Sequence, residues 1–161
     1  MSDEIIELLR EVKRLGQRYY QLTGKPLGVT AEVAEYEAFR LLGITLVEVR
    51  NPGFDAIADR DGQVVRYQIK GRCFDRRIEK GQRVGSLSLD KEWDAALLVL
   101  LDPDFEAREI WEASRDSLTS LLTNPGSRAR TERGQIAVKQ FKRAGKCIWR
   151  STPQNSNEAP R

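Results

Sequence analysis

Residues 54–70 have the sequence FDAIADRDGQVVRYQIK, and this stretch decides the fold. Residues 54–58 and 64–70 contain alternating and β-branched apolar residues, a pattern that predicts two strands. Arg60-Asp61-Gly62 lies between them and is typical of a tight hairpin turn. The sequence therefore predicts an antiparallel β-hairpin.

Four groups of this hairpin are expected to converge. Side chains alternate between the two faces of a strand, so Gln68 and Lys70 point the same way while Ile69 points into the core. Pairing across the hairpin brings Asp55 next to Gln68. A carboxylate, an amide oxygen, the Ile69 carbonyl and an ammonium group then surround one point. Hard oxygen ligands of this kind suit Mg²⁺.

The rest of the chain predicts helices before the hairpin and mixed elements after it. An apolar stripe at helical spacing marks residues 3–22, with Ile5, Leu8, Leu9, Val12, Leu15 and Tyr19 on it. Further helices are expected at residues 30–42 with Thr30 as N-cap, at 115–122 behind Ser114, and at 139–144. Strands are expected at 44–49, 95–101, 108–113 and 147–149. This order indicates an α/β protein with a mixed central β-sheet flanked by helices. We expect residues 1–150 to form one domain and the polar residues 151–161 to be a disordered tail.

Composition excludes many kinds of active site. The chain has no histidine and only two cysteines among its 161 residues. This excludes histidine-based hydrolysis, and two cysteines alone are too few to form a zinc site. The sequence contains neither a phosphate-loop nor a dinucleotide-binding motif. Catalysis would therefore depend on carboxylates, amides, lysines, arginines or hydroxyls, with an oxygen-liganded metal.

The location expected from the sequence is the cytoplasm. No apolar run is long enough to span a membrane, so no membrane partner is expected. The acidic start, Met1-Ser2-Asp3-Glu4, lacks the features of a signal peptide. Two scattered cysteines are typical of a reducing compartment.

Charge is unevenly distributed although the net charge is only +3. Residues 60–83 carry 8 Lys/Arg against 3 Asp/Glu, and residues 127–150 carry 8 against 1. Between them, residues 90–116 carry 9 acids and 3 bases. Two basic segments can fold into one positive face that binds a polyanion. The alternative is that these charged loops are only solvated.

The hairpin and the segment before it resemble the PD-(D/E)xK nuclease superfamily. Gly53-Phe54-Asp55 and Gln68-Ile69-Lys70 match its two-part motif, and residues 28–35 match its helical glutamate element. Glu32 is our first choice for that glutamate and Glu35 the second. The resemblance covers roughly residues 28–101. The chain departs from the pattern at Phe54, which stands in place of proline, and at Gln68, which stands in place of the second carboxylate, as in the QxK variants of the family.

This resemblance implies a restriction-endonuclease-like fold and hydrolysis of a phosphodiester bond, with DNA as the expected substrate. Asp55, Glu32, Gln68 and the Ile69 carbonyl would hold Mg²⁺ or Mn²⁺, which activates water and stabilises developing charge. Lys70 would orient the water or neutralise the phosphate. A homodimer would serve two-strand cleavage. Flanking phosphates would contact Arg66, Arg72, Arg76, Arg77, Lys80, Arg83, Lys139, Lys142 and Arg143.

Two other functions fit the same residues. The chain could be a catalytically inactive nucleic-acid-binding module of this fold, in which Gln68 marks lost metal affinity. It could also be a small α/β protein-interaction domain. Metal binding separates the first of these from the nuclease, and salt-dependent nucleic-acid affinity separates it from the interaction domain.

Overall fold

The computed structural model describes residues 2–24, 26–47, 53–73, 82–123 and 135–152. Within these ranges the protein has a six-stranded sheet with strand order β1-β2-β3-β4-β5-β6. The strands are β1 (Thr45–Leu46), β2 (Ala56–Arg60), β3 (Gln63–Cys73), β4 (Ala95–Leu101), β5 (Ala107–Ser114) and β6 (Lys146–Arg150). The expected tail at 151–161 lies outside the described residues from Pro153 onward.

The sheet is mixed, as predicted. Strands β3 and β4 are parallel, and every other neighbouring pair is antiparallel. All seven residues of β4 are buried, which is expected of a central strand covered on both faces. The α/β class and the mixed central sheet flanked by helices are therefore confirmed.

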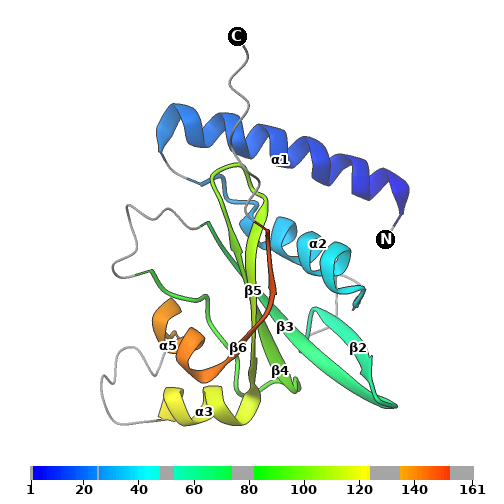
Figure 1. The fold of residues 1–161 in the computed structure, drawn as a ribbon, viewed down its shortest axis with the longest axis vertical. Helices are drawn as coiled ribbons and strands as arrows, with labels where there is room; N and C mark the ends of the chain where they lie inside the picture. The colour runs from blue at the N-terminus through cyan, green and yellow to red at the C-terminus, as the bar shows by residue number, and fades with distance from the viewer. Residues whose placement is uncertain (1, 25, 48–52, 74–81, 124–134, 153–161) are drawn as a thin grey trace.

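Helices cover both faces of this sheet (Figure 1). Alternate residues of β4 belong to two separate apolar cores because side chains of a strand alternate in direction. Leu97, Val99 and Leu101 pack in the core that includes α2 (Thr30–Leu42). Leu98 and Leu100 pack in the core that includes α3 (Arg115–Thr123) and α5 (Val138–Ala144). The sheet is thus the middle layer of three.

The hairpin turn and the helix ends follow from local sequence. Asp61 and Gly62 have positive φ angles of 56° and 81°, as expected of a two-residue hairpin turn. Gly43 ends α2 in the left-handed conformation, and Ser114 accepts a hydrogen bond from the Ser117 N–H at the start of α3. The N-cap prediction at Thr30 is wrong. Val29 occupies the cap position, and the Thr30 hydroxyl instead donates to the Leu27 carbonyl at 3.2 Å.

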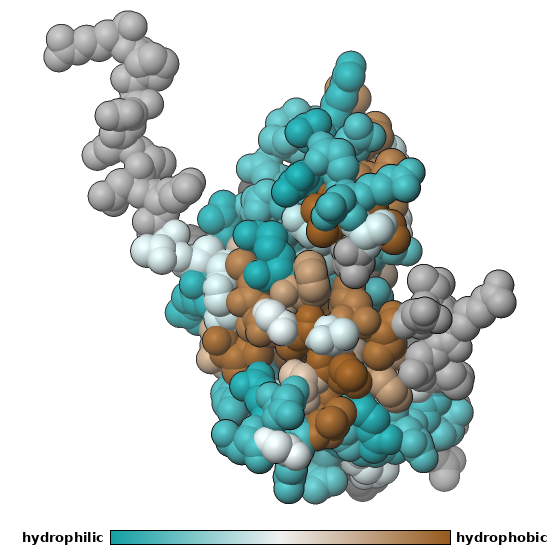
Figure 2. All heavy atoms as spheres, turned by 90° about the vertical axis from the view of Figure 1, so that its right-hand side faces the viewer, coloured by the Kyte–Doolittle hydropathy of each residue, from teal (hydrophilic) through white to brown (hydrophobic). Residues whose placement is uncertain are grey.

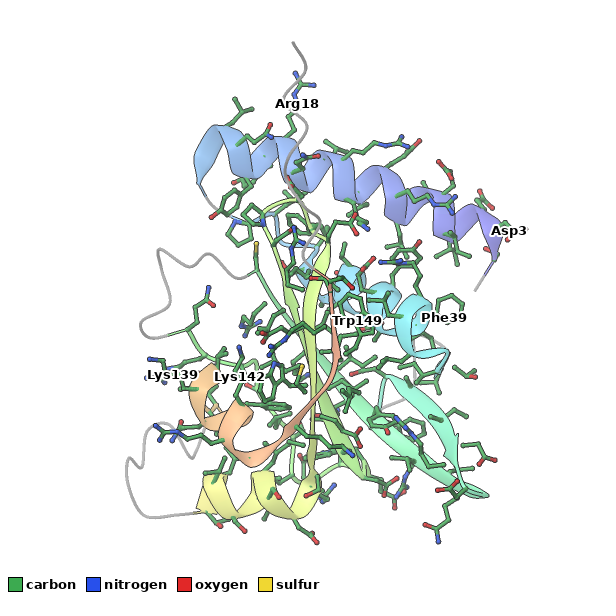
Figure 3. The ribbon with its side chains drawn as sticks, in the orientation of Figure 1. Asp3, Arg18, Phe39, Lys139, Lys142 and Trp149 are labelled. Carbon is green, nitrogen blue, oxygen red and sulfur yellow. The ribbon has the colours of Figure 1, made fainter. Side chains whose placement is uncertain are left out.

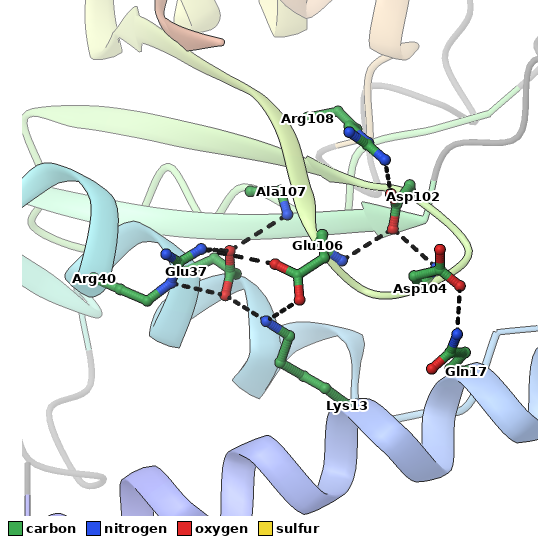
Figure 4. A network of polar contacts seen from close by, with 9 residues as sticks. All are labelled: Lys13, Gln17, Glu37, Arg40, Asp102, Asp104, Glu106, Ala107 and Arg108. Atoms are coloured by element: carbon green, nitrogen blue, oxygen red, sulfur yellow. Dashed lines mark hydrogen bonds and ion pairs between the residues drawn. The ribbon is translucent and has the colours of Figure 1, made fainter. Parts of the chain in front are cut away.

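A buried carboxylate ties three elements together at one end of the sheet (Figure 4). Glu37 of α2 is fully buried and accepts from Lys13 of α1 (Asp3–Thr23) at 3.1 Å and from Arg40 at 2.7 Å. The Ala107 N–H of β5 also donates to Glu37. Lys13 forms a second ion pair with Glu106 at 2.7 Å. Since these contacts satisfy the buried charge, they fix α1 and α2 against the β4–β5 turn.

In the part of the chain that the structure describes, no helix is long and apolar enough to cross a membrane.

Candidate functional site

The backbone of the hairpin fixes Asp55 immediately before β2, which begins at Ala56 and not at Phe54 as expected. Ala56 pairs with Tyr67, so the same register places Asp55 opposite Gln68. The Asp55 N–H donates to the Tyr67 carbonyl at 2.8 Å. One carboxylate oxygen, Oδ2, accepts from the Ile69 N–H at 2.7 Å. The predicted proximity of Asp55 to the Gln68-Ile69-Lys70 segment is therefore present.

Gln68 presents an unpaired oxygen in the same place. The side chain is 6% exposed, and its Nε2 donates to the Gly53 carbonyl at 3.2 Å. This bond fixes the orientation of the amide, because the flipped amide would oppose two oxygens. The remaining atom, Oε1, is buried and has no hydrogen-bond partner among the residues that the structure describes. A buried acceptor without a partner costs about 1–3 kcal/mol, so it is a candidate ligand for a cation.

Helix α2 approaches β3 very closely beside this point. A Cβ atom built on Gly71 would lie 2.5 Å from the Thr30 carbonyl and 2.6 Å from the Ala34 Cβ. Glycine is therefore required for this contact between the first turns of α2 and the strand. The contact places the first turns of α2, which carry Glu32 and Glu35, next to the end of Gln68-Ile69-Lys70.

Glu35 is the α2 carboxylate that lies deeper in this region. Burial, together with the negative charges of Asp55 and Glu32, raises the pKa of Glu35 to about 7, and Lys70 opposes this shift. Glu32, our first choice from the sequence, is exposed. The charge of Glu32 contributes to the raised pKa of Glu35. Glu35 is the half-buried glutamate, and its pKa also responds to the charges of Asp55 and Lys70. The sequence alone could not separate them, because the two residues lie one helical turn apart.

Ile69 and Lys70 occupy the places that strand alternation predicts. Ile69 is buried in the core that includes α2. Its N–H points toward Asp55, and the carbonyl of a strand residue points to the same edge as its N–H. Lys70 is half-buried and forms no hydrogen bond or ion pair with any residue that the structure describes. Its positive charge is therefore free to act on Glu35 or on a bound anion.

The donor set suits a hard cation in chemistry but is poor in carboxylates. Asp55, Glu35, Gln68 and the Ile69 carbonyl all offer oxygen atoms, and Gln68 Oε1 has no partner within the described part of the chain. Within the described ranges, however, no three Asp, Glu, His or Cys side chains form a metal-binding group. A cation in this place would rely on the amide and carbonyl oxygens as well as on carboxylates.

The two basic segments of the sequence meet beside Lys70. Arg83 forms a β-bridge with Ala137, just before α5, and the Val138 N–H donates to the Gln82 carbonyl at 3.0 Å. A Cβ atom on Gly85 would lie 3.5 Å from Lys70 Cδ and 3.3 Å from Arg72 Nη2. Residues 82–85 therefore connect the candidate site to the start of α5. Nothing in the charge pattern alone locates this connection.

The predicted phosphate-binding residues fall into two groups in the structure. Arg66 forms ion pairs with Asp94 at 3.0 Å and Glu92 at 2.8 Å, which raise its pKa. Lys142 pairs with Glu109 at 2.7 Å, so both charges already have acidic partners.

Other basic side chains of the set remain available. Arg83, Lys139 and Arg143 are exposed, and Lys139 extends away from the molecule on α5 (Figure 3). Arg72 donates to the Gly71 and Arg83 carbonyls, and burial lowers its pKa. Arg76, Arg77 and Lys80 lie outside the described residues. The available charges gather around residues 82–85 and α5.

Comparison with known proteins gives no family for this chain. No protein-family model matches it. A search of curated proteins also finds no match. The functional argument therefore depends on the geometry of the site.

Proposed function

We propose that this chain is a metal-dependent endonuclease of the restriction-endonuclease-like fold, a QxK variant of the PD-(D/E)xK type. It would hydrolyse phosphodiester bonds, with DNA as the expected substrate and the cytoplasm as the expected location. The observation that carries the proposal is the buried, unpaired Gln68 Oε1 beside Asp55. A strand that buries an unsatisfied oxygen next to a fixed carboxylate is well suited to bind a divalent cation.

The residues of the site would have two separate roles, metal binding and contact with the phosphate or the attacking water. Asp55, Glu35, Gln68 and the Ile69 carbonyl would hold Mg²⁺ or Mn²⁺, with Glu32 as the alternative helical ligand. The ion, when bound, supplies charge stabilisation at the phosphate and lowers the pKa of water. Lys70 forms no ion pair with a described residue, so it can bind a phosphate oxygen or orient the attacking water.

The position of the available basic residues supports a polyanionic substrate. Arg83, Lys139 and Arg143 lie on the segments that connect to Lys70 through Gly85. Contacts of this type bind phosphates without reading base sequence. The substrate backbone would therefore run from α5 toward Lys70.

An inactive nucleic-acid-binding module is the second candidate. It is favoured by the neutral Gln68 and by the lack of three clustered carboxylates among the described residues. In that case the basic residues would bind nucleic acid and no cation would be needed. A protein-interaction domain is the third candidate, and the exposed apolar side chains of α1 favour it.

Nicking of a supercoiled plasmid tests the proposal. Wild type should nick DNA with Mg²⁺ or Mn²⁺ and lose this activity in EDTA. Asp55→Asn and Lys70→Ala should remain folded and lose at least 100-fold in rate, because each removes one charge that acts on the reacting phosphate. Asp61→Asn in the exposed hairpin turn and Lys146→Ala at the exposed start of β6 are the matched controls, and both should cut normally.

The outcomes separate the three functions. Metal-dependent cutting by both site variants at the wild-type rate would show that the site is wrong. DNA binding without metal binding or cutting would support the inactive module. If the protein neither cuts nor binds DNA at low salt, the protein-interaction domain would be the favoured function.

A further inference from the structure

Helix α1 carries an apolar seam in which five of the six residues are exposed within the part of the chain that the structure describes. Six of its large apolar residues follow one another at alternating steps of three and four. The seam consists of Ile5, Leu8, Val12, Leu15, Tyr19 and Leu22. This 3-4 spacing is the heptad repeat of a coiled coil, with Ile5, Val12 and Tyr19 at the a positions and the leucines at the d positions.

The seam is exposed except at Val12, which is half-buried and packs against the core that includes α2. The d-position residues Leu8, Leu15 and Leu22 are 54%, 62% and 78% exposed. The helix contacts its own protein mainly through the neighbouring side, where Gly16 packs under the Phe105 ring and Lys13 reaches Glu37. Figure 2 looks along α1 from its N-terminal end, and apolar residues lie on one side of this end of the molecule with polar residues on the other.

We infer that α1 pairs with α1 of a second copy, antiparallel, to form a homodimer. A three-heptad repeat is the pattern that two equal helices bury against each other, whereas a single helix on a globular core needs a wider apolar face. The inference is independent of the proposed nuclease activity.

Charge along α1 supports the antiparallel orientation. Residues 3–11 carry four acids and one base, while residues 12–18 carry three bases and no acid. In an antiparallel pair the acidic half of each helix lies beside the basic half of the other. Packing a positions against d positions then aligns Ile5 with Leu22 of the second copy, and it places Glu11 next to Arg18 of the second copy.

Glu11 and Arg18 are suited to this role. Both lie at g positions beside the seam, and antiparallel pairs bring g positions together. Both are exposed and neither forms an ion pair within the described residues. Arg18 points away from the sheet (Figure 3). A parallel pair would instead place Glu11 beside Gly16, with no charge to meet it.

The size of the seam predicts a dimer of moderate affinity. The 21 residues of α1 span about 31 Å, and a seam one helix wide along this length buries roughly 600–1,000 Å² in total. Interfaces of this size are at the low end of specific complexes. We therefore expect a dissociation constant on the order of 10 µM.

Sedimentation equilibrium from about 1 to 200 µM tests the inference. Wild type should change from the mass of one chain to that of two, and Leu15→Glu should remain monomeric at ~200 µM. Val64→Glu is the matched control, because Val64 is also an exposed apolar residue, 63% exposed, but lies on the hairpin. This variant should dimerise like wild type. A monomeric wild type at ~200 µM, or a Leu15→Glu dimer, would overturn the inference.

Charge reversal tests the orientation. Glu11→Arg and Arg18→Glu should each weaken the dimer about tenfold, because each places like charges together twice in the symmetric pair. The double variant should restore affinity to within about threefold of wild type. Additive weakening in the double variant would overturn the antiparallel arrangement.

Discussion

A change of one atom at Gln68, from the amide nitrogen to an oxygen, tests whether a metal ion binds beside this residue. Gln68→Glu has nearly the same shape and adds one negative charge beside the expected ion. At about 4 Å that charge is worth a few kcal/mol at an effective dielectric near 20, before desolvation, repulsion from Asp55 and the lost hydrogen bond to the Gly53 carbonyl are subtracted. We therefore expect Mn²⁺ to bind about tenfold more tightly, measured by calorimetric titration.

The control for this change is Gln68→Met, which keeps the side-chain volume and removes the oxygen. It should remain folded, since it loses the bond to the Gly53 carbonyl but also removes the unpaired Oε1. Its Mn²⁺ affinity should fall. Equal affinity in wild type and both variants would mean that Gln68 is not a ligand, and the inactive module would then be favoured.

Glu35 gives the protein a pH-dependent stability. Folding raises the pKa of Glu35 from 4.5 to about 7, so the folded state binds this proton more tightly than the unfolded chain. That contribution is complete below pH 4.5 and is lost as the pH rises through 7. Glu35→Gln stays neutral, so its stability relative to wild type should increase from pH 5 to pH 8. Urea unfolding at both pH values in EDTA measures the difference, and an unchanged difference would contradict it.

At the scale of elements, the contact between α2 and β3 is the feature that positions the site. Gly71→Ala would drive a methyl group into the Thr30 carbonyl and the Ala34 side chain. We expect a loss of ~1–3 kcal/mol in the free energy of unfolding, measured with urea, because backbone has to move. Gly28→Ala is the matched control. Its Cβ meets no atom within 4 Å, so its stability should equal or slightly exceed that of wild type.

The elements that the sequence predicts well are those with strong local signals. The seven apolar residues of β4 and the Asp61-Gly62 turn are found where they are expected. The strand expected at 44–49 is shorter in the structure, which assigns only Thr45–Leu46 to β1 and does not describe residues 48–49. Edge strands carry little periodicity of their own, so their length depends on pairing with a neighbour.

The parts of the site that the sequence could not predict depend on tertiary contacts. Strand alternation was enough to place Asp55, Gln68, Ile69 and Lys70. Choosing Glu35 over Glu32 as the inward carboxylate requires the rotation of α2 on β3, which only the packing at Gly71 fixes. The pairing of Arg66 with Asp94 likewise joins residues 28 positions apart.

At the scale of the whole molecule, the available basic residues should make DNA binding sensitive to salt. If six phosphates are contacted, the log–log slope of affinity against salt is about −5. Replacing Arg83, Lys139 and Arg143 together by alanine should reduce the magnitude of the slope by about 3. Fluorescence anisotropy with a short duplex measures it. Lys91→Ala in the acidic segment is the control and should leave the slope unchanged.

The buried Glu37 makes α1 inseparable from the rest of the protein. Cutting the chain after residue 24 would remove Lys13 and leave the fully buried Glu37 carboxylate with Arg40 as its cation, a loss that costs up to about 3–5 kcal/mol. Such a shortened protein would be unstable as well as monomeric. Hydrogen exchange should accordingly show α1 amides near Lys13 protected to the same degree as those of α2. The helix that carries the apolar seam would then unfold only together with the rest of the protein.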